Sequence, residues 1–70
     1  MQRFKNKSDV TIGSRVIFDN LTSFLKDLPK VRMIGDVVST DSENNDVTVN
    51  LYIVGHEEPI EVKLPFYLLQ

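Results

Sequence analysis

The sequence predicts a mainly β domain, a small five-stranded barrel with a short helix inserted between its first two strands. The strongest observation is a pair of segments with alternating apolar residues, 47–54 and 60–64, separated by a turn that contains Gly55, which is typical of a β-hairpin. The second observation is the length of 70 residues, which suits one domain with a thin core. Short strands without a second layer of helices bury their apolar faces best when the sheet closes into a barrel.

The chain is expected to begin with a flexible arm and an irregular strand. Residues 1–7 are basic and polar and carry no periodic pattern, so the domain itself is expected over 8–70. The first strand is expected over 10–18, where the apolar residues share one parity. Gly13 lies in the middle of this segment and predicts a bulge or a kink there.

A short helix is predicted directly after this strand. Its apolar residues recur at i, i+3, i+4 and i+7. They are Leu21, Phe24, Leu25 and Leu28. Asp19 or Asn20 is the expected N-cap, and Pro29 is expected to end the helix. Because about two turns are too few to be stable alone, the stripe is expected to pack on the sheet. The alternative is that Phe24 and Leu25 stay partly exposed and bind a partner.

Three further segments complete the predicted sheet. Residues 31–40 show an interrupted strand pattern, in which Gly35 is expected to mark a bend or bulge where two backbones pass close together. The Asn- and Asp-rich segment 40–46 predicts a turn before the next strand. Pro65 cannot continue the ladder of the strand at 60–64, so a helical turn and a brief last strand are expected after it.

Two glycine-led segments resemble the KOW motif. Gly13 opens the first, Gly-Ser-Arg-Val, and Gly35 opens the second, Gly-Asp-Val-Val. The segment 49–62 looks like the one that follows this motif in the C-terminal domain of the transcription factor NusG. The resemblance covers about half of the chain, from Gly35 onward. The first half departs from it, because the predicted helical segment stands where NusG-like domains have a short turn.

This resemblance implies an SH3-like barrel that acts as a non-catalytic adaptor in transcription elongation and antitermination. The implied partner is a ribosomal protein, a termination factor or the RNA polymerase assembly. The positions that match the family's docking edge are Ile53, Val54, Gly55 and His56. Val54 is also an apolar residue on the otherwise polar face of its strand, which fits either a contact with a partner or packing under the helix or a neighbouring loop.

Two other binding roles stay open. The length and the long first connection also fit a small SH3-like accessory subunit of a larger complex, for example a photosynthetic or respiratory one. The third role is RNA binding by a small barrel, since basic and aromatic side chains on strand faces bind RNA. The candidate side chains for RNA are Arg3, Lys5, Lys7, Arg15, Arg32 and Tyr52.

Charge is distributed unevenly along the chain. Residues 1–35 carry seven basic and three acidic side chains, a net +4, while residues 36–70 carry one and seven, a net −6, and together they give the formal −2. Phosphate binding needs a clustered positive face. The sequence therefore disfavours a uniformly basic nucleic-acid surface but allows one basic end.

No catalytic, cofactor or metal chemistry is predicted. The sequence contains no cysteine and one histidine, His56, so thiolate sites are excluded and one imidazole cannot build a metal site alone. The carboxylates fall in expected turns or on an outward strand face, whereas general acid–base catalysis needs a titratable pair in a pocket. Since no apolar run reaches the length of a membrane span and the start lacks a signal-peptide core, a cytoplasmic location is expected.

Overall fold

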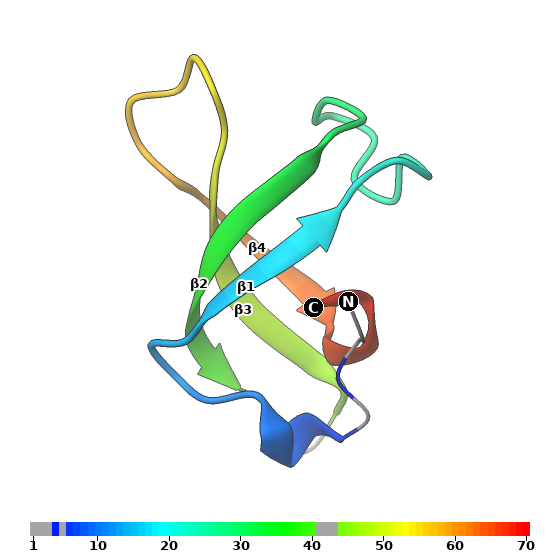
Figure 1. The fold of residues 1–70 in the computed structure, drawn as a ribbon, viewed down its shortest axis with the longest axis vertical. Helices are drawn as coiled ribbons and strands as arrows, with labels where there is room; N and C mark the ends of the chain where they lie inside the picture. The colour runs from blue at the N-terminus through cyan, green and yellow to red at the C-terminus, as the bar shows by residue number, and fades with distance from the viewer. Residues whose placement is uncertain (1–3, 5, 41–43) are drawn as a thin grey trace.

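Four antiparallel strands form one sheet in the computed structural model, which describes residues 4, 6–40 and 44–70 (Figure 1). Each strand pairs with the next one along the chain. One 3₁₀-helix precedes the sheet and another follows it. The elements are η1 (Lys7–Asp9), β1 (Arg15–Asp19), β2 (Arg32–Thr40), β3 (Asp46–Tyr52), β4 (Ile60–Pro65) and η2 (Phe66–Leu68).

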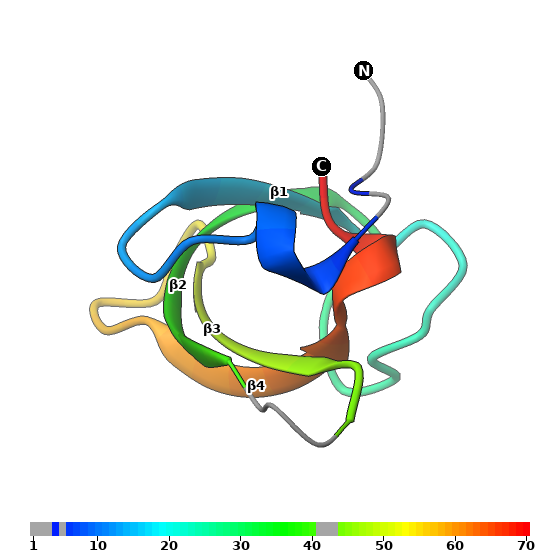
Figure 2. The same cartoon turned by 90° about the horizontal axis from the view of Figure 1, so that it is seen from below.

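The sheet curves strongly around one core, so that β1 and β4 lie on opposite sides of it when the molecule is viewed end on (Figure 2). Strand periodicity sets this core, because alternate residues of a strand point to the same face. Even-numbered positions of β1 and odd-numbered positions of β2 and β3 face inward. The buried apolar side chains are Val10, Val16, Phe18, Met33, Val37, Val47, Val49, Leu51, Ile53, Leu64 and Leu69.

Gly35 lies on the inward face of β2, opposite Leu51 of β3. A Cβ atom at Gly35 would lie 2.5 Å from Val49 Cγ1 and 2.9 Å from the carbonyl oxygen of Asn50. Side-chain carbons do not approach other atoms this closely. The close approach of two backbones predicted at Gly35 is confirmed, whereas the irregularity in the β2–β3 register lies between Val37 and Ser39 instead of at Gly35.

The last residues of the chain lie along the free side of β1. Phe18 forms an isolated antiparallel bridge with Leu69, and the backbones of Ile17 and Gln70 exchange two hydrogen bonds of 2.9 Å each. The helical turn predicted after Pro65 is confirmed as η2. The predicted last strand is reduced to this bridge, so the regular sheet of the described residues has four strands instead of five.

The chain before β1 is less extended than the predicted strand over 10–18. Gly13 has a φ of +89°, which places a turn there, and β1 begins only at Arg15. The predicted start of the domain at Ser8 falls within η1. Phe4 already packs against the core, and its N–H donates to the carbonyl of Leu69 at 3.3 Å. At Phe4, therefore, the expected flexible arm is held against the sheet.

The connection between β2 and β3 has an irregular start and an Asx-type end. The register of the two strands shifts between Val37 and Ser39, and Val38 is exposed at this bulge. Residues 41–43 of the predicted turn lie outside the described residues. Asn44 Oδ1 accepts a hydrogen bond from the N–H of Asp46 at 3.1 Å, which is the local bonding expected of an asparagine in a turn.

The helix predicted over residues 20–30 is wrong, because the segment that connects β1 to β2 is a loop of turns and bends (Figure 1). Asn20, one of the two predicted N-caps, is fully buried and lies at the centre of the loop. Its Nδ2 donates to the carbonyls of Leu25 at 3.0 Å, Leu28 at 3.3 Å and Pro29 at 2.9 Å. Its Oδ1 accepts from the N–H of Leu25 at 3.0 Å. We refer to residues 20–31 as the Asn20 loop.

Competition for backbone hydrogen bonds explains why the loop replaces the helix. Asparagine side chains bond to nearby backbone groups in non-helical conformations, and a helix of about two turns offers little stability against this alternative. Ser23 has a φ of 59°, in the left-handed region, which interrupts a right-handed helix. The backbone N–H of Asn20 also donates to the carbonyl of Val31 at 3.1 Å, which closes the loop.

Candidate functional site

An apolar groove lies where β2 begins and β3 ends. Ile34 and Tyr52 are cross-strand partners on the outward face of the sheet, and Val31 and Val54 lie just beyond the ends of the two strands. The groove has a volume of about 420 Å³. Its lining residues are Pro29, Val31, Arg32, Met33, Ile34, Tyr52, Ile53 and Val54. We call this feature the apolar groove.

Four apolar side chains of the groove are unusually exposed. Val31, Ile34 and Tyr52 are each nearly half exposed, and Val54 has a relative exposure of 102%. Val54 lies in the turn after β3, where Gly55 adopts a φ of +91° and the N–H of His56 donates to the carbonyl of Ile53 at 3.0 Å. The tight turn therefore holds the valine away from the core.

The predicted docking edge divides in the structure. Ile53 is buried and belongs to the core, although it also lines the groove. Val54, Gly55 and His56 are exposed. Of the predicted edge residues, Val54 thus presents the exposed apolar surface. Arg32 also lines the groove, and it was expected only as an RNA contact.

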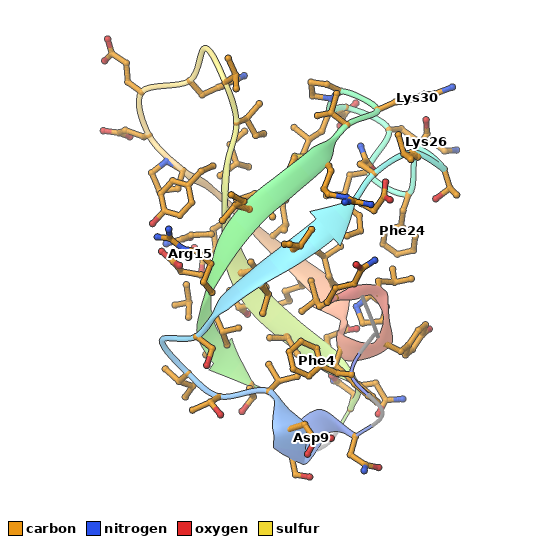
Figure 3. All side chains as sticks on the ribbon, viewed as in Figure 1. Phe4, Asp9, Arg15, Phe24, Lys26 and Lys30 are labelled. Atoms are coloured by element: carbon orange, nitrogen blue, oxygen red, sulfur yellow. The ribbon has the colours of Figure 1, made fainter. Side chains whose placement is uncertain are left out.

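Phe24 and Leu25, the other predicted partner contacts, lie on the Asn20 loop and do not line the apolar groove. Phe24 is half exposed and meets Phe18 edge to face at a ring distance of 6.4 Å, whereas Leu25 is partly buried. Figure 3 shows Phe24 pointing from the loop back toward the body of the molecule and Lys30 extending outward. The two expected docking elements therefore form separate surfaces.

A polar cluster borders the groove at Tyr52. The Tyr52 hydroxyl donates to Asp36 Oδ2 at 2.6 Å, and Arg15 Nε donates to Asp36 Oδ1 at 3.3 Å. The hydrogen bond from Tyr52, followed by the contact with Arg15, lowers the pKa of Asp36 below its ordinary value. The same hydrogen bond raises the pKa of Tyr52. The cluster fixes the orientation of the Tyr52 ring at one end of the groove.

Replacing Tyr52 by phenylalanine is expected to raise the pKa of Asp36 toward its ordinary value, because the hydroxyl is the largest cause of the lowering. A lowered folded-state pKa stabilises the fold above the unfolded pKa, and this contribution is lost as the pH falls through the folded value. The Tyr52→Phe variant should therefore lose stability relative to the parent above the ordinary carboxyl pKa. A carboxyl NMR titration measures the shift, and Tyr67→Phe, at another half-exposed tyrosine, is the control. An unchanged Asp36 titration contradicts the assignment.

The candidate RNA-binding side chains are not gathered into one cationic patch by the described residues. Arg15 pairs with Asp36, and Arg32 Nη2 lies 3.7 Å from Asp19 Oδ2, so both cations have acidic neighbours. Lys7 belongs to η1, at the end of the molecule opposite the Asn20 loop (Figure 1). The two remaining cationic candidates, Arg3 and Lys5, lie outside the described residues.

Sequence reasoning missed four of the groove residues, Pro29, Val31, Met33 and Ile34. The signal for Ile34 was present, because it is an apolar residue on the opposite face to Met33 and Gly35. Its meaning depends on the cross-strand register that places it beside Tyr52. That register is a property of the folded sheet.

Neither a metal-ligand cluster, nor a membrane-spanning helix, nor a similar known protein adds to the candidate site in the described part of the chain. Across residues 4, 6–40 and 44–70, no three His, Cys, Asp or Glu side chains gather as metal ligands would. In the same part of the chain, no helix is both long and apolar enough to cross a membrane. Comparisons with models of protein families, with curated proteins and with solved structures give no significant match.

Proposed function

We propose that the chain is a non-catalytic protein-binding module of SH3-like barrel type, which binds its partner through the apolar groove. The barrel assignment takes Leu69 and Gln70 as a short fifth strand. Its support is the bridge of Leu69 to Phe18 and the two hydrogen bonds between Ile17 and Gln70, with η2 preceding them. Small barrels of this kind close their sheets in order to remove strand edges.

The observation that carries the binding function is the complete exposure of Val54 beside three other exposed apolar side chains. A contiguous exposed apolar surface in water marks an interaction site more often than it marks an ordinary surface. Val54 is held by a tight turn, so it does not need to reorganise before it binds. Preorganised groups lose less conformational entropy on binding.

The positive charge of Arg32 at the groove indicates what kind of partner fits there. Arg32 lines the groove, its side chain is 61% exposed, and its ion pair with Asp19 is long at 3.7 Å. An exposed guanidinium at the rim of an apolar groove complements a carboxylate. We therefore propose that the partner is a protein segment with apolar anchor residues and a neighbouring Asp or Glu, and not a nucleic acid.

The resemblance of residues 35–62 to NusG C-terminal domains bears on the biological setting. It favours an adaptor in transcription elongation or antitermination, acting in the cytoplasm, with a ribosomal protein, a termination factor or the RNA polymerase assembly as partner. An accessory subunit of a larger complex would use the same groove permanently. The chemistry of the groove is common to both settings, so the first test addresses the groove itself.

The test is a titration by amide NMR with two synthetic peptides that contain the same three apolar residues, one flanked by aspartates and the other by lysines. The acidic peptide is expected to shift the amide signals of Val31, Ile34, Tyr52 and Val54, and the basic one to bind more weakly. Because burial of a valine is worth about 1.5–3 kcal/mol, Val54→Asp should weaken binding about tenfold or more.

Ile12→Asp is the matched control, since Ile12 is 62% exposed and lies outside the groove. This variant is expected to bind the acidic peptide like the parent chain. Equal weakening by Ile12→Asp and Val54→Asp would overturn the assignment, as would shifts confined to residues outside the groove. Circular dichroism of both variants checks that the fold is kept.

A further inference from the structure

The outer edge of β4 is open in the structure. At Ile17, the free side of β1 is covered by Gln70, which exchanges two backbone hydrogen bonds with it. The far side of Leu69 accepts a hydrogen bond from Phe4. In the described part of the chain, β4 pairs with β3 alone, and the Asn20 loop donates no backbone hydrogen bond to it. The edge of β4 is therefore the site where the sheet can be extended.

The hydrogen-bond pattern identifies which residues of β4 face this open edge. In an antiparallel ladder, residues alternate between bonding to the neighbour strand and pointing away from it. The N–H of Phe66 donates to the carbonyl of Asn45 at 2.9 Å, in continuation of the β3–β4 register. Positions 60, 62 and 64 therefore bond to β3. Glu61 and Lys63 direct their N–H and C=O groups outward.

The same alternation holds on the other side of the sheet, which supports the assignment. The N–H of Val37 donates to the carbonyl of Ser14 at 2.9 Å, while Ile17 bonds outward to Gln70. Propagating the pattern from β1 through β2 and β3 gives the same outward positions on β4. Two independent ends of the ladder thus agree.

Glu61 and Lys63 carry opposite charges, and both side chains are exposed. Neither forms an ion pair with another described residue. A two-fold axis through Val62 would place Glu61 of one copy opposite Lys63 of the second copy, and the reverse. Both pairs would also exchange backbone hydrogen bonds, four in total by the antiparallel pattern. A closed two-fold contact needs this kind of self-complementary surface.

The competing two-fold registers are unfavourable. An axis through Glu61 sets two glutamates opposite each other, and an axis through Lys63 sets two lysines opposite each other, which destabilises a strand pair. Pro59 precedes the strand and Pro65 is its last residue; neither has an N–H group, so the pairing is limited to the residues between them. The charge pattern therefore selects the register centred on Val62.

We propose that a second copy of this chain binds along β4, by antiparallel β4–β4 pairing centred on Val62. A depression of about 420 Å³ separates Ile60 and Val62 of the strand from the segment Phe24–Leu28 of the Asn20 loop. This interface is separate from the apolar groove, none of whose lining residues belongs to β4. The contact is small, so the dimer is expected to be weak and concentration-dependent.

A charge-swap series tests the register by sedimentation equilibrium of the full chain at increasing concentration. Lys63→Glu sets glutamates opposite each other and should raise the dimer dissociation constant about tenfold or more. The double variant Glu61→Lys with Lys63→Glu restores both pairs and should return the constant to that of the parent. Lys30→Glu, with the same change of net charge at an exposed loop position that lines neither the depression nor the apolar groove, should leave it unchanged.

A cross-linking test locates the two-fold axis. The chain has no cysteine, so Val62→Cys introduces a single thiol that meets its own copy across the axis. This variant should form a disulfide dimer on mild oxidation, whereas Ile12→Cys, at an exposed position elsewhere, should not. A chain that stays monomeric at every concentration would overturn the proposal and would leave the charges and prolines as protection of the edge against aggregation.

Two further outcomes would also overturn it. The first is equal weakening of the dimer by Lys63→Glu and by the double variant, since the charge pairing would then be irrelevant. The second is loss of the dimer in Val54→Asp, because self-association would then run through the apolar groove. Binding of the acidic peptide to the groove is measured separately, so failure of the dimer leaves the proposed function intact.

Discussion

Replacing Asn20 by alanine is expected to destabilise the fold by about 3 kcal/mol or more. The side chain is fully buried and bonds to three carbonyls and one N–H of the Asn20 loop. Alanine would leave these groups without a partner at a site from which water is excluded. A chain of 70 residues has a total stability of roughly 4–10 kcal/mol. Thermal unfolding should therefore shift down by more than about 10 °C.

Two variants separate this effect from the simple loss of volume. Asn20→Asp keeps the size and the acceptor but loses the donor, and it turns a negative charge toward the three carbonyls. It should destabilise at least as much as alanine at neutral pH, and less when acid protonates the carboxyl group. Asn45→Ala, at an exposed side chain, should change stability by less than about 0.5 kcal/mol. An Asp variant as stable as the parent would contradict the hydrogen-bond explanation.

Asn20 also explains why the helix predicted over residues 20–30 is wrong. The apolar spacing that predicts a helix is real, and Leu25 and Leu28 do pack against the core. Leu21 and Phe24, at the same helical spacing, stay exposed. Spacing describes which residues can share a face, but it does not say whether backbone groups bond to each other or to a side chain. The four hydrogen bonds of one buried amide decide that competition.

The β3–β4 hairpin was predictable for the opposite reason. Alternation over residues 47–54 and 60–64 indicates directly which side chains face the core, and neither β3 nor β4 contains a buried polar side chain comparable to Asn20. The candidate site was only half predictable. The sequence singled out Val54 because it breaks the apolar alternation of residues 47–53, although its exposure comes from the turn after β3. Its association with Val31 depends on how β2 and β3 align.

Gly35→Ala is expected to destabilise the fold by about 2 kcal/mol, and Gly35→Val is expected to prevent folding. Gly35 does not have a positive φ, so alanine is compatible with its backbone conformation and the cost is steric. The added Cβ would meet Val49 Cγ1 at 2.5 Å and the carbonyl oxygen of Asn50 at 2.9 Å. A backbone oxygen in the β2–β3 ladder cannot move without breaking that ladder. Urea unfolding of the purified variants measures the loss.

A double-mutant cycle with Val49→Ala tests the steric origin. Val49→Ala alone leaves a cavity in the core and should destabilise the fold by about 1.5–3 kcal/mol. In the double variant the nearest contact of the new Cβ is absent. The stability lost by the double variant should therefore be about 1 kcal/mol smaller than the sum of the losses in the two single variants. The rescue stays partial because the carbonyl of Asn50 remains in place. Strictly additive losses would show that Gly35 is required for a reason other than the packing of β2 against Val49.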